Sequence, residues 1–325
     1  MPSAPPNHTL IIDTLSANDV ERFRRDTLNI TALDFEKPIG VCVSGGADSV
    51  ALLLLAQAAF PLVVAATVDH GLRPESRAEA EFVASICLNL GVPHSILPVT
   101  VAKDGNVSDQ ARKARYQALT IWAAKEHLAC LMTAHHADDQ LETLIMRLNR
   151  GAGVGGLAGI RAVNEGVVRP LLHWRKAELE TIVRTCRITP IDDPTNRNDQ
   201  FDRARLRKSL ATADWLDPQA AAHSADALSE AETALAWSAK RIAVERVTET
   251  GDEISFNPTD VPRELQRRIL LACFERLAPA QNPRGDALDR MIFALHQGKT
   301  VTLGAIKGRG GAVWHLTKAP PRRKN

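Results

Sequence analysis

The chain has 325 residues, of which 45% are hydrophobic and 24% are charged, and its formal net charge at pH 7 is +2. That length allows about two domains, since domains usually contain about 100 to 200 residues. The composition is typical of a globular protein and excludes a largely disordered chain. The first residues lack the charged start and apolar core of a secretory signal, and no span is long enough to cross a bilayer. We therefore expect no membrane partner.

The cysteines are odd in number, lie mostly in apolar runs and show no C-x-x-C spacing. They are Cys42, Cys87, Cys130, Cys186 and Cys273. Scattered cysteines of this kind are typical of reduced core residues and argue against disulfides, zinc sites and iron-sulfur centres. The sequence therefore predicts a cytoplasmic protein.

The first distinctive element is a loop at 44–49, Ser-Gly-Gly-Ala-Asp-Ser, between an apolar strand-like run at 39–43 and an Ala- and Leu-rich helical run at 50–58. Gly45 and Gly46 allow unusual backbone angles and leave the main-chain amides open to a ligand. These amides, together with the positive end of the helix dipole, are typical of a phosphate site. We predict that all six residues, Ser44, Gly45, Gly46, Ala47, Asp48 and Ser49, bind a nucleotide.

The side chains of the loop support that prediction. Ser44 and Ser49 offer hydroxyl donors to phosphate oxygens, and Asp48 is a suitable ligand for a magnesium ion that bridges them. The loop lacks the lysine of a Walker A sequence, so a hydrolytic P-loop NTPase does not fit. The simpler alternative is a tight turn in which one polar residue caps the helix, but capping accounts for one polar residue only.

Strands and helices alternate from about residue 38 to residue 172. Strands are expected at 62–68, 95–99 and 128–133, and helices at 76–90 and 108–126. This alternation predicts an α/β fold, a doubly wound and mainly parallel sheet with helices on both faces. Ligands of such sheets bind at the carboxyl ends of the strands, where the loop at 44–49, Asp69 and His135 are all expected.

A second group of polar residues begins the helix that follows His135. Its apolar positions are Leu141, Leu144, Ile145 and Leu148, which share one face and leave Asp139 and Glu142 together on the side expected to be exposed. Two carboxylates there suit an ammonium group or a metal ion, and His135 could order a substrate. Acidic residues are also favoured in a first helical turn by the dipole alone, so this alternative stays open.

Several basic residues are further candidates. Arg112 and Arg115, one turn apart, are suited to phosphate, although a solvated helix face is the simpler explanation when these residues are taken alone. The stretch from Arg150 and Gly151 to Gly159 is too rich in glycine for a packed element and predicts a mobile loop or a close-approach surface over a substrate. A third group consists of three arginines at alternating positions, Arg203, Arg205 and Arg207. Arginines in this arrangement can bind a nucleic-acid backbone, or they can form a basic segment that is simply solvated.

The domain boundaries follow from these patterns. We expect an N-terminal extension at 1–24, poorly ordered at its start, and a nucleotide-binding domain at 25–216. A long helix is expected from Asp217-Pro218. It opens a smaller, mostly helical C-terminal domain at 217–325 that ends in strand-like runs at 301–303 and 312–316 and in a short basic tail.

The loop at 44–49 resembles the PP-loop of the N-type ATP pyrophosphatases, and the later motifs narrow the resemblance to the tRNA(Ile)-lysidine synthetase family. The matching segments are Val68-Asp69-His70-Gly71-Leu72-Arg73, Ala111-Arg112-x-x-Arg115-Tyr116, His135-His136-x-Asp138-Asp139-Gln140-x-Glu142-Thr143, the glycine-rich stretch after Arg150, Asp193-Pro194-x-Asn196, and Phe201-x-Arg203-x-Arg205-x-Arg207. They cover residues 38 to 210 densely.

The resemblance implies a ligase that uses ATP and Mg²⁺. ATP would adenylate the wobble cytidine of the CAU-anticodon tRNA(Ile), and free L-lysine would then displace AMP to form lysidine. Asp48, Asp139, Glu142, Arg112 and Arg115 would be catalytic. Asp69 and His135 would join the loop at 44–49 in binding ATP, and Arg150, Gly151, Arg203, Arg205 and Arg207 would bind tRNA. The C-terminal domain would also contact tRNA, and no protein partner is evident.

Three alternatives remain. A tRNA thiolation enzyme of the same superfamily generally needs paired cysteines, which this chain lacks. A GMP or NAD synthetase is disfavoured because the chain has no glutaminase-like half. A nucleotide-sensing or RNA-binding module without turnover would have little need for so many polar residues at one sheet edge.

Overall fold

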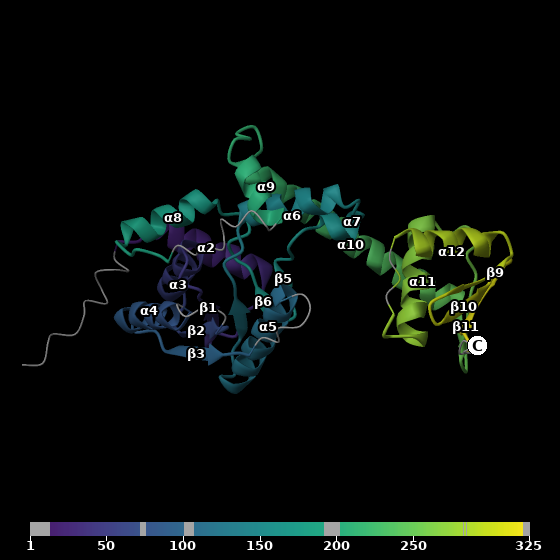
Figure 1. Cartoon of the computed structure of the whole chain (residues 1–325), viewed down its shortest axis with the longest axis horizontal. Helices are drawn as coiled ribbons and strands as arrows, with labels where there is room; N and C mark the ends of the chain where they lie inside the picture. The colour runs from purple at the N-terminus through teal and green to yellow at the C-terminus, as the bar shows by residue number, and fades with distance from the viewer. Residues whose placement is uncertain are drawn as a thin grey trace, which may run out of the picture. The chain divides into compact units, whose positions relative to one another are not determined.

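The computed structural model describes residues 14–71, 76–100, 107–191, 202–281, 283 and 285–320, with side chains from residue 110 onward in the segment that begins at 107. The chain forms two compact units, residues 1–229 and 230–325 (Figure 1). The division lies inside helix α10, Pro218–Arg246, whereas the expected domain boundary near residue 216 lies just before that helix. The Leu72, Arg73, Asp193 to Asn196 and Phe201 positions of the sequence motifs, and the basic tail from residue 321, lie outside the described residues.

The first unit contains a six-stranded sheet in the order β3-β2-β1-β4-β6-β5. Its strands are β1 Ile39–Cys42, β2 Val63–Asp69, β3 His94–Pro98, β4 Cys130–Met132, β5 Val163–Asn164 and β6 Val167–Val168. Every pair is parallel except the short β5–β6 pair. The predicted α/β fold with a mainly parallel sheet is confirmed, and the three strands expected after β1 lie within one or two residues of their predicted positions.

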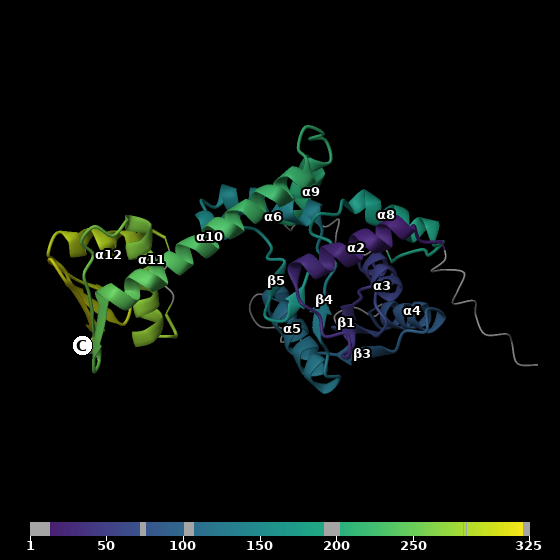
Figure 2. The ribbon, with the colours of Figure 1, turned by 180° about the vertical axis from the view of Figure 1, so that it is seen from behind.

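Helices cover both faces of this sheet (Figures 1 and 2). They are α2 Ala17–Ile30, α3 Ala47–Ala59, α4 Ser76–Asn89, α5 Val107–Lys125, α6 Ala137–Asn149, α7 Val154–Leu157, α8 Lys176–Thr185 and α9 Asp202–Leu210. Side chains alternate across a strand, so Ile39 and Val41 of β1 pack with α2, α3 and α8 in one core, whereas Cys42 faces a smaller core. Leu119 and Trp122 of α5 fill that second core. Helix α3 lies in the middle of the larger core, which explains its almost wholly apolar sequence.

The second unit combines the end of α10 with two helices and a five-stranded antiparallel sheet in the order β7-β8-β11-β10-β9. The elements are β7 Val247–Thr250, β8 Glu253–Phe256, α11 Arg263–Leu277, α12 Asp286–His296, β9 Thr300–Leu303, β10 Ile306–Arg309 and β11 Trp314–Lys318. Its core includes Phe256, Phe274 and Trp314. The sheet is larger than the two expected strand-like runs because the added strands are only four residues long and too short to stand out by periodicity.

Across the described ranges, no helix has the length and apolar character needed to span a membrane.

Candidate active site

The loop at 44–49 turns from β1 into α3 at the carboxyl edge of the sheet. Gly45 has a positive φ of 89°, and a side chain there would overlap Ile191, whose backbone N–H donates to the Gly45 carbonyl at 2.9 Å. Gly46 begins the helix as its N-cap, and the nearest atom to a Cβ built there is Ser44 Oγ at 3.9 Å. Gly45 therefore permits the turn, and Gly46 leaves the helix N-terminus open to a ligand.

The two serines of the loop have different surroundings. Ser49 is buried; its Oγ donates to the Gly46 carbonyl at 2.9 Å and accepts from the Ser44 backbone N–H at 3.1 Å. Ser44 Oγ lies 3.2 Å from Ser49 Oγ. The hydroxyl of Ser49 thus closes the loop, and the Ser44 hydroxyl is the one that remains adaptable toward a ligand.

A cavity of about 1010 Å³ opens in front of this loop. Its walls come from the ends of β1, β2 and β4 and from the helices α3, α4, α5, α6, α8 and α9. The charged and titratable side chains that line it are Asp48, His70, Glu79, Arg115, His135, His136, Asp139, Glu142, Lys176, Glu180, Arg203 and Arg207. The cavity therefore brings the first and second groups of candidate residues together, as the sheet-edge argument predicts.

His136 connects these two groups. Its ring is buried, with Nε2 3.5 Å from Asp48 Oδ2 and 3.6 Å from Asp139 Oδ2, and with Nδ1 3.5 Å from Asp138 Oδ2. Burial by itself would lower the pKa of His136, but Asp138, Asp48 and Asp139 outweigh it and raise the pKa to about 10. His136 is therefore a buried cation at neutral pH. The sequence motif contains His136 but assigns it no role; its place directly before α6, at the carboxyl end of β4, is the signal that points to it.

The position of Asp139 and Glu142 corrects one expectation. Their side chains are not exposed; that of Glu142 is 5% accessible, and both lie beneath two arginines of α9. Arg203 Nε donates to Glu142 Oε2 at 2.6 Å and Arg207 Nε donates to Glu142 Oε1 at 2.5 Å. Arg203 Nη2 also donates to Asp139 Oδ1 at 3.2 Å. The helical spacing placed the two carboxylates on one side correctly, but it could not show that α9 packs over that side.

The same contacts divide the three alternating arginines. Arg203 and Arg207 are one turn apart on α9 and face the cavity, whereas Arg205 pairs with Asp202 on the exposed side. Arg150 lies 4.0 Å from Asp202, also on the surface. The run of arginines is therefore not a single basic face, because residues two apart on a helix point in different directions.

The other predicted residues take up varied positions. His135 lines the cavity, and its Nδ1 is 3.0 Å from Thr133 Oγ1; burial lowers the pKa of His135 to about 4, so the ring is neutral at pH 7. Arg115 also lines the cavity, whereas Arg112 is exposed and its guanidinium lies 5.1 Å from the ring centre of Tyr116. Asp69 ends β2 outside the cavity wall and accepts a hydrogen bond from the Gly71 N–H.

Helix α6 also holds the glycine-rich segment. The buried amide of Gln140 donates to the Ile160 carbonyl at 2.8 Å and accepts from the Ile160 N–H at 2.7 Å. Arg147 donates to the Gly156 and Gly159 carbonyls. Gly159 has a φ of 64°, and a side chain there would overlap Gln140. The segment is thus packed against α6 and includes the short helix α7, whereas its glycine content predicted no packed element. Gly151, in contrast, has open space around it.

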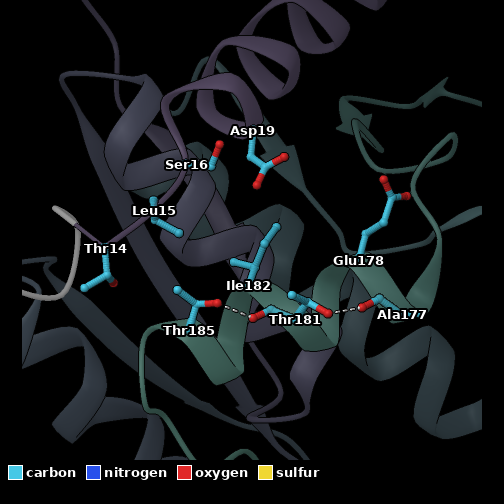
Figure 3. A pocket seen from close by; sticks show the side chains of 9 residues that line it. All are labelled: Thr14, Leu15, Ser16, Asp19, Ala177, Glu178, Thr181, Ile182 and Thr185. Carbon is cyan, nitrogen blue, oxygen red and sulfur yellow. Dashed lines mark hydrogen bonds between the residues drawn. The ribbon is translucent and has the colours of Figure 1, made fainter.

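A second hollow lies between the start of α2 and α8 (Figure 3). Two of its hydroxyl groups bond within α8, with Thr181 donating to the Ala177 carbonyl at 2.8 Å and Thr185 donating to the Thr181 carbonyl at 2.9 Å. Glu178 accepts from Arg22 at 2.7 Å. The polar groups that α8 presents here are thus bonded within the protein, and we treat the hollow as a surface groove.

Asp48 is the residue best suited to hold magnesium. Its Oδ1 is buried and accepts no hydrogen bond from the described residues, so one oxygen is available to a cation. Magnesium bound to a nucleotide needs only one or two carboxylates, since phosphates and water complete its shell. Within the described ranges, no group of three or more His, Cys, Asp and Glu side chains is arranged to hold a metal ion. The fit therefore depends on Asp48 and the phosphates together.

Comparison with known proteins agrees with this geometry. The model of the PP-loop domain family matches residues 19–213, which include the loop at 44–49 and every element that lines the cavity. Among solved structures, a U34-tRNA thiolase NcsA from Methanococcus maripaludis has a TM-score of 0.54 and 16% identity, covering 66% of this chain and 80% of the thiolase. At that identity the likeness shows the fold alone.

Relatives similar in sequence extend over most of the chain. A tRNA(Ile)-lysidine synthase of Zymomonas mobilis is 42% identical over 296 residues, which are 88% of this chain and 90% of the relative. Another from Novosphingobium aromaticivorans is 42% identical over 315 residues, covering 94% and 95%. A third from Ruegeria pomeroyi is 39% identical and covers 85% and 70%. The chain therefore belongs to the tRNA(Ile)-lysidine synthase family of PP-loop, ATP-using ligases.

Proposed function

We propose that the chain joins free L-lysine to the wobble cytidine of the CAU-anticodon tRNA(Ile) at the expense of ATP. The observation that carries this proposal is the shared cavity, in which the phosphate loop at 44–49 and the carboxylates of α6 line the same space. A nucleotide and an amine must meet in one site for this reaction, and family membership supplies the substrate class.

In the first step the carbonyl oxygen on carbon 2 of the cytidine attacks the α-phosphorus of ATP, and pyrophosphate leaves. The open amides at Gly46, the Ser44 hydroxyl and the start of α3 are suited to hold the departing pyrophosphate. Arg115 reaches the same cavity and adds positive charge, while Arg112 lies outside it and would serve only a more distant phosphate. His135 completes the proposed ATP site at the end of β4, whereas Asp69, at the end of β2, lies outside the cavity wall and would reach only a part of the nucleotide beyond it.

Magnesium, held by Asp48 and the phosphates, would neutralise charge that builds up on the leaving group. His136 keeps Asp48 oriented, because the imidazolium lies between that carboxylate and Asp139. The nucleotide end and the amine end of the cavity are thereby joined through one buried side chain.

In the second step the lysine amine attacks carbon 2, and AMP leaves with the oxygen that it received. Asp139 and Glu142 are suited to an ammonium group and to the proton that the amine loses. Arg203 and Arg207 already neutralise these carboxylates, so the incoming amine must share them or displace the guanidinium groups.

The tRNA is proposed to reach the cavity past the glycine segment, where Arg150 and Gly151 are exposed, and past Arg205 on the outer side of α9. The second unit would add contacts to the same tRNA. We place catalysis in the first unit, residues 1–229, which includes α2, and the accessory role in the second unit, residues 230–325. We further propose that the protein lies in the cytoplasm, and we propose no protein partner.

The test is to incubate the protein with ATP, magnesium, labelled lysine and total tRNA, and to identify the labelled species. Label in the CAU-anticodon tRNA(Ile) alone is the expected result. Label in no RNA, or in many tRNAs regardless of anticodon, would contradict the proposal.

A further inference from the structure

Two charged groups of the amino-acid substrate have no site in the proposed function. Free lysine carries three charges at neutral pH, and only its ε-amine is placed, at Asp139 and Glu142. Its Cα, which bears the α-carboxylate and the α-ammonium, lies about 6 Å from that amine, because five bonds of about 1.5 Å separate the two atoms in an extended side chain. A site that distinguishes lysine from a simple amine therefore needs a second pair of opposite charges within that reach.

Helix α8 supplies such a pair. Lys176 and Glu180 are four residues apart and both line the cavity. The residues that α8 contributes to the other hollow are Ala177, Glu178, Thr181, Ile182 and Thr185 (Figure 3). Residues four apart lie on one face of a helix, so the ammonium and the carboxylate stand side by side. They are 3.8 Å apart, beyond hydrogen-bonding distance, and thus form a loose pair that can turn to a ligand.

The start of α8 is fixed beside the start of α6. The Lys176 backbone N–H donates to Asp138 Oδ2 at 2.8 Å. The Ala137 N–H donates to the Trp174 carbonyl at 2.9 Å. Because Asp138 directly precedes Asp139, the charged pair of α8 and the carboxylates of α6 belong to neighbouring walls of the cavity.

Exposure to solvent falls from the pair on α8 to the carboxylates on α6. The side chains of Lys176 and Glu180 are 48% and 51% accessible. The corresponding values are 13% for Asp139 and 5% for Glu142. A ligand that spans this gradient keeps two charges near water, where holding them costs little, and carries one amine inward on an uncharged chain. Free lysine has this distribution of charge.

The other cations of the cavity wall already act on other groups. Arg203 and Arg207 pair with the carboxylates of α6. His136 lies among three aspartates. Burial, and then the charge of Arg115, lower the pKa of His70 just after β2, so Arg115 lies on the side where the nucleotide is proposed. Among the described residues of the wall, the ammonium on α8 is thus the cation best placed for the carboxylate of an amino acid.

We propose that Lys176 and Glu180 bind the α-carboxylate and the α-ammonium of the free lysine, while its ε-amine reaches the carboxylates of α6. The inference rests on the proposed function for the identity of the amino acid. It assigns the selection of lysine among amines to α8. Any alkylamine satisfies the carboxylates of α6, whereas a pair of opposite charges matches an α-amino acid and not a simple amine.

The test compares the Kd of three ligands, measured by titration calorimetry with ATP and magnesium present and tRNA absent, at about pH 6.5, where an α-amino group is charged. The ligands are L-lysine, L-lysinamide, which lacks the carboxylate charge, and 6-aminohexanoate, which lacks the α-ammonium. The wild type should bind lysine about tenfold more tightly than either analogue, as expected for one charged hydrogen bond at a half-exposed position.

The variants should remove these preferences one at a time. Lys176→Met should weaken lysine binding about tenfold and abolish the preference over lysinamide, while it keeps the preference over 6-aminohexanoate. Glu180→Gln should do the converse. Lys176→Arg keeps the charge and should keep both preferences. A ratio of two Kd values on one folded protein does not change through a loss of stability alone.

The matched control is Arg184→Met, which removes a cation from α8 outside the cavity and should leave both ratios at the wild-type values. A wild-type ratio of lysine to lysinamide in Lys176→Met would overturn the proposal, as would an equal loss of that ratio in the control.

Transfer of labelled lysine to tRNA by the wild type is measured in parallel. If the wild type makes lysidine while the ratios of the α8 variants stay at the wild-type values, only this inference fails. If the wild type transfers no lysine, the proposed function fails, and the Kd ratios still decide whether α8 holds the α groups of an amino acid. Absence of any lysine binding would overturn both.

Discussion

Replacing Glu142 by Gln tests the cluster of charges that closes the cavity. The carboxylate is almost fully buried and both of its oxygens accept bonds from guanidinium groups, Arg203 at 2.6 Å and Arg207 at 2.5 Å. Glutamine keeps the shape of the side chain, but it removes the charge and turns one acceptor into a donor that faces a cation.

The expected cost follows from that geometry. Breaking a fully buried ion pair costs about 3 to 5 kcal/mol. The two arginines are 42% and 37% exposed, so solvent screens the pairs, and we expect the free energy of unfolding to fall by about 1 to 3 kcal/mol. For a unit of 229 residues, a loss of 1 kcal/mol lowers the Tm by about 2 to 4 °C, which predicts a total shift of roughly 2 to 12 °C.

Calorimetry of wild type and variant measures this shift, and Glu180→Gln, a partly exposed carboxylate of the same cavity, is the control. If Glu142 also holds the lysine amine, the KM for lysine should rise at least tenfold while tRNA-dependent ATP-pyrophosphate exchange continues. An unchanged Tm together with an unchanged KM would refute both the structural and the functional reasoning. Loss of exchange with a normal Tm would assign Glu142 to the first step instead.

Three further changes have defined outcomes. Asp48→Asn removes the only charged side chain of the phosphate loop. It should therefore abolish tRNA-dependent ATP-pyrophosphate exchange and leave the Kd for tRNA within a few fold. Exchange near the wild-type rate would exclude the magnesium role of Asp48. Gly159→Ala should lower the free energy of unfolding by about 1 kcal/mol or more, since the φ of Gly159 is positive and a Cβ there would overlap Gln140. Wild-type stability of this variant in chemical denaturation would contradict the prediction. The pKa of His173 is raised, chiefly by its bond with Asp226, so its contribution to stability is complete below the unfolded pKa of about 6.5 and is lost as the pH rises through the folded pKa. Unfolding curves from pH 5.5 to 8.5 should therefore show a falling component that His173→Asn removes.

Local sequence was sufficient to place the phosphate loop and the sheet edge. Gly45 and Gly46 lie between an apolar strand and an apolar helix, and glycine is the residue that allows the positive φ of Gly45 and the open space beside Gly46. The order of strands and helices likewise follows from hydrophobic periodicity, because each element buries its own apolar side.

The contacts between distant segments could not be read from the sequence. Arg203 follows Glu142 by 61 residues, and nothing in the local pattern shows that α9 packs over α6. The same limit explains why Asp139 and Glu142 were expected to be exposed. Local sequence does not single out His136, because its importance comes from Asp48, which lies in the first turn of α3, far from His136 in the chain. In the second unit, strands of four residues carry too few alternations to identify a sheet.

The most direct test of the central claim is to follow the α-phosphate of ATP. With lysine omitted, label from that phosphate should appear on the CAU-anticodon tRNA(Ile), and adding unlabelled lysine should release it as AMP while the tRNA gains one lysine. Lysine transfer with no label on the tRNA at any stage, or label that lysine does not release, would contradict an adenylated RNA intermediate.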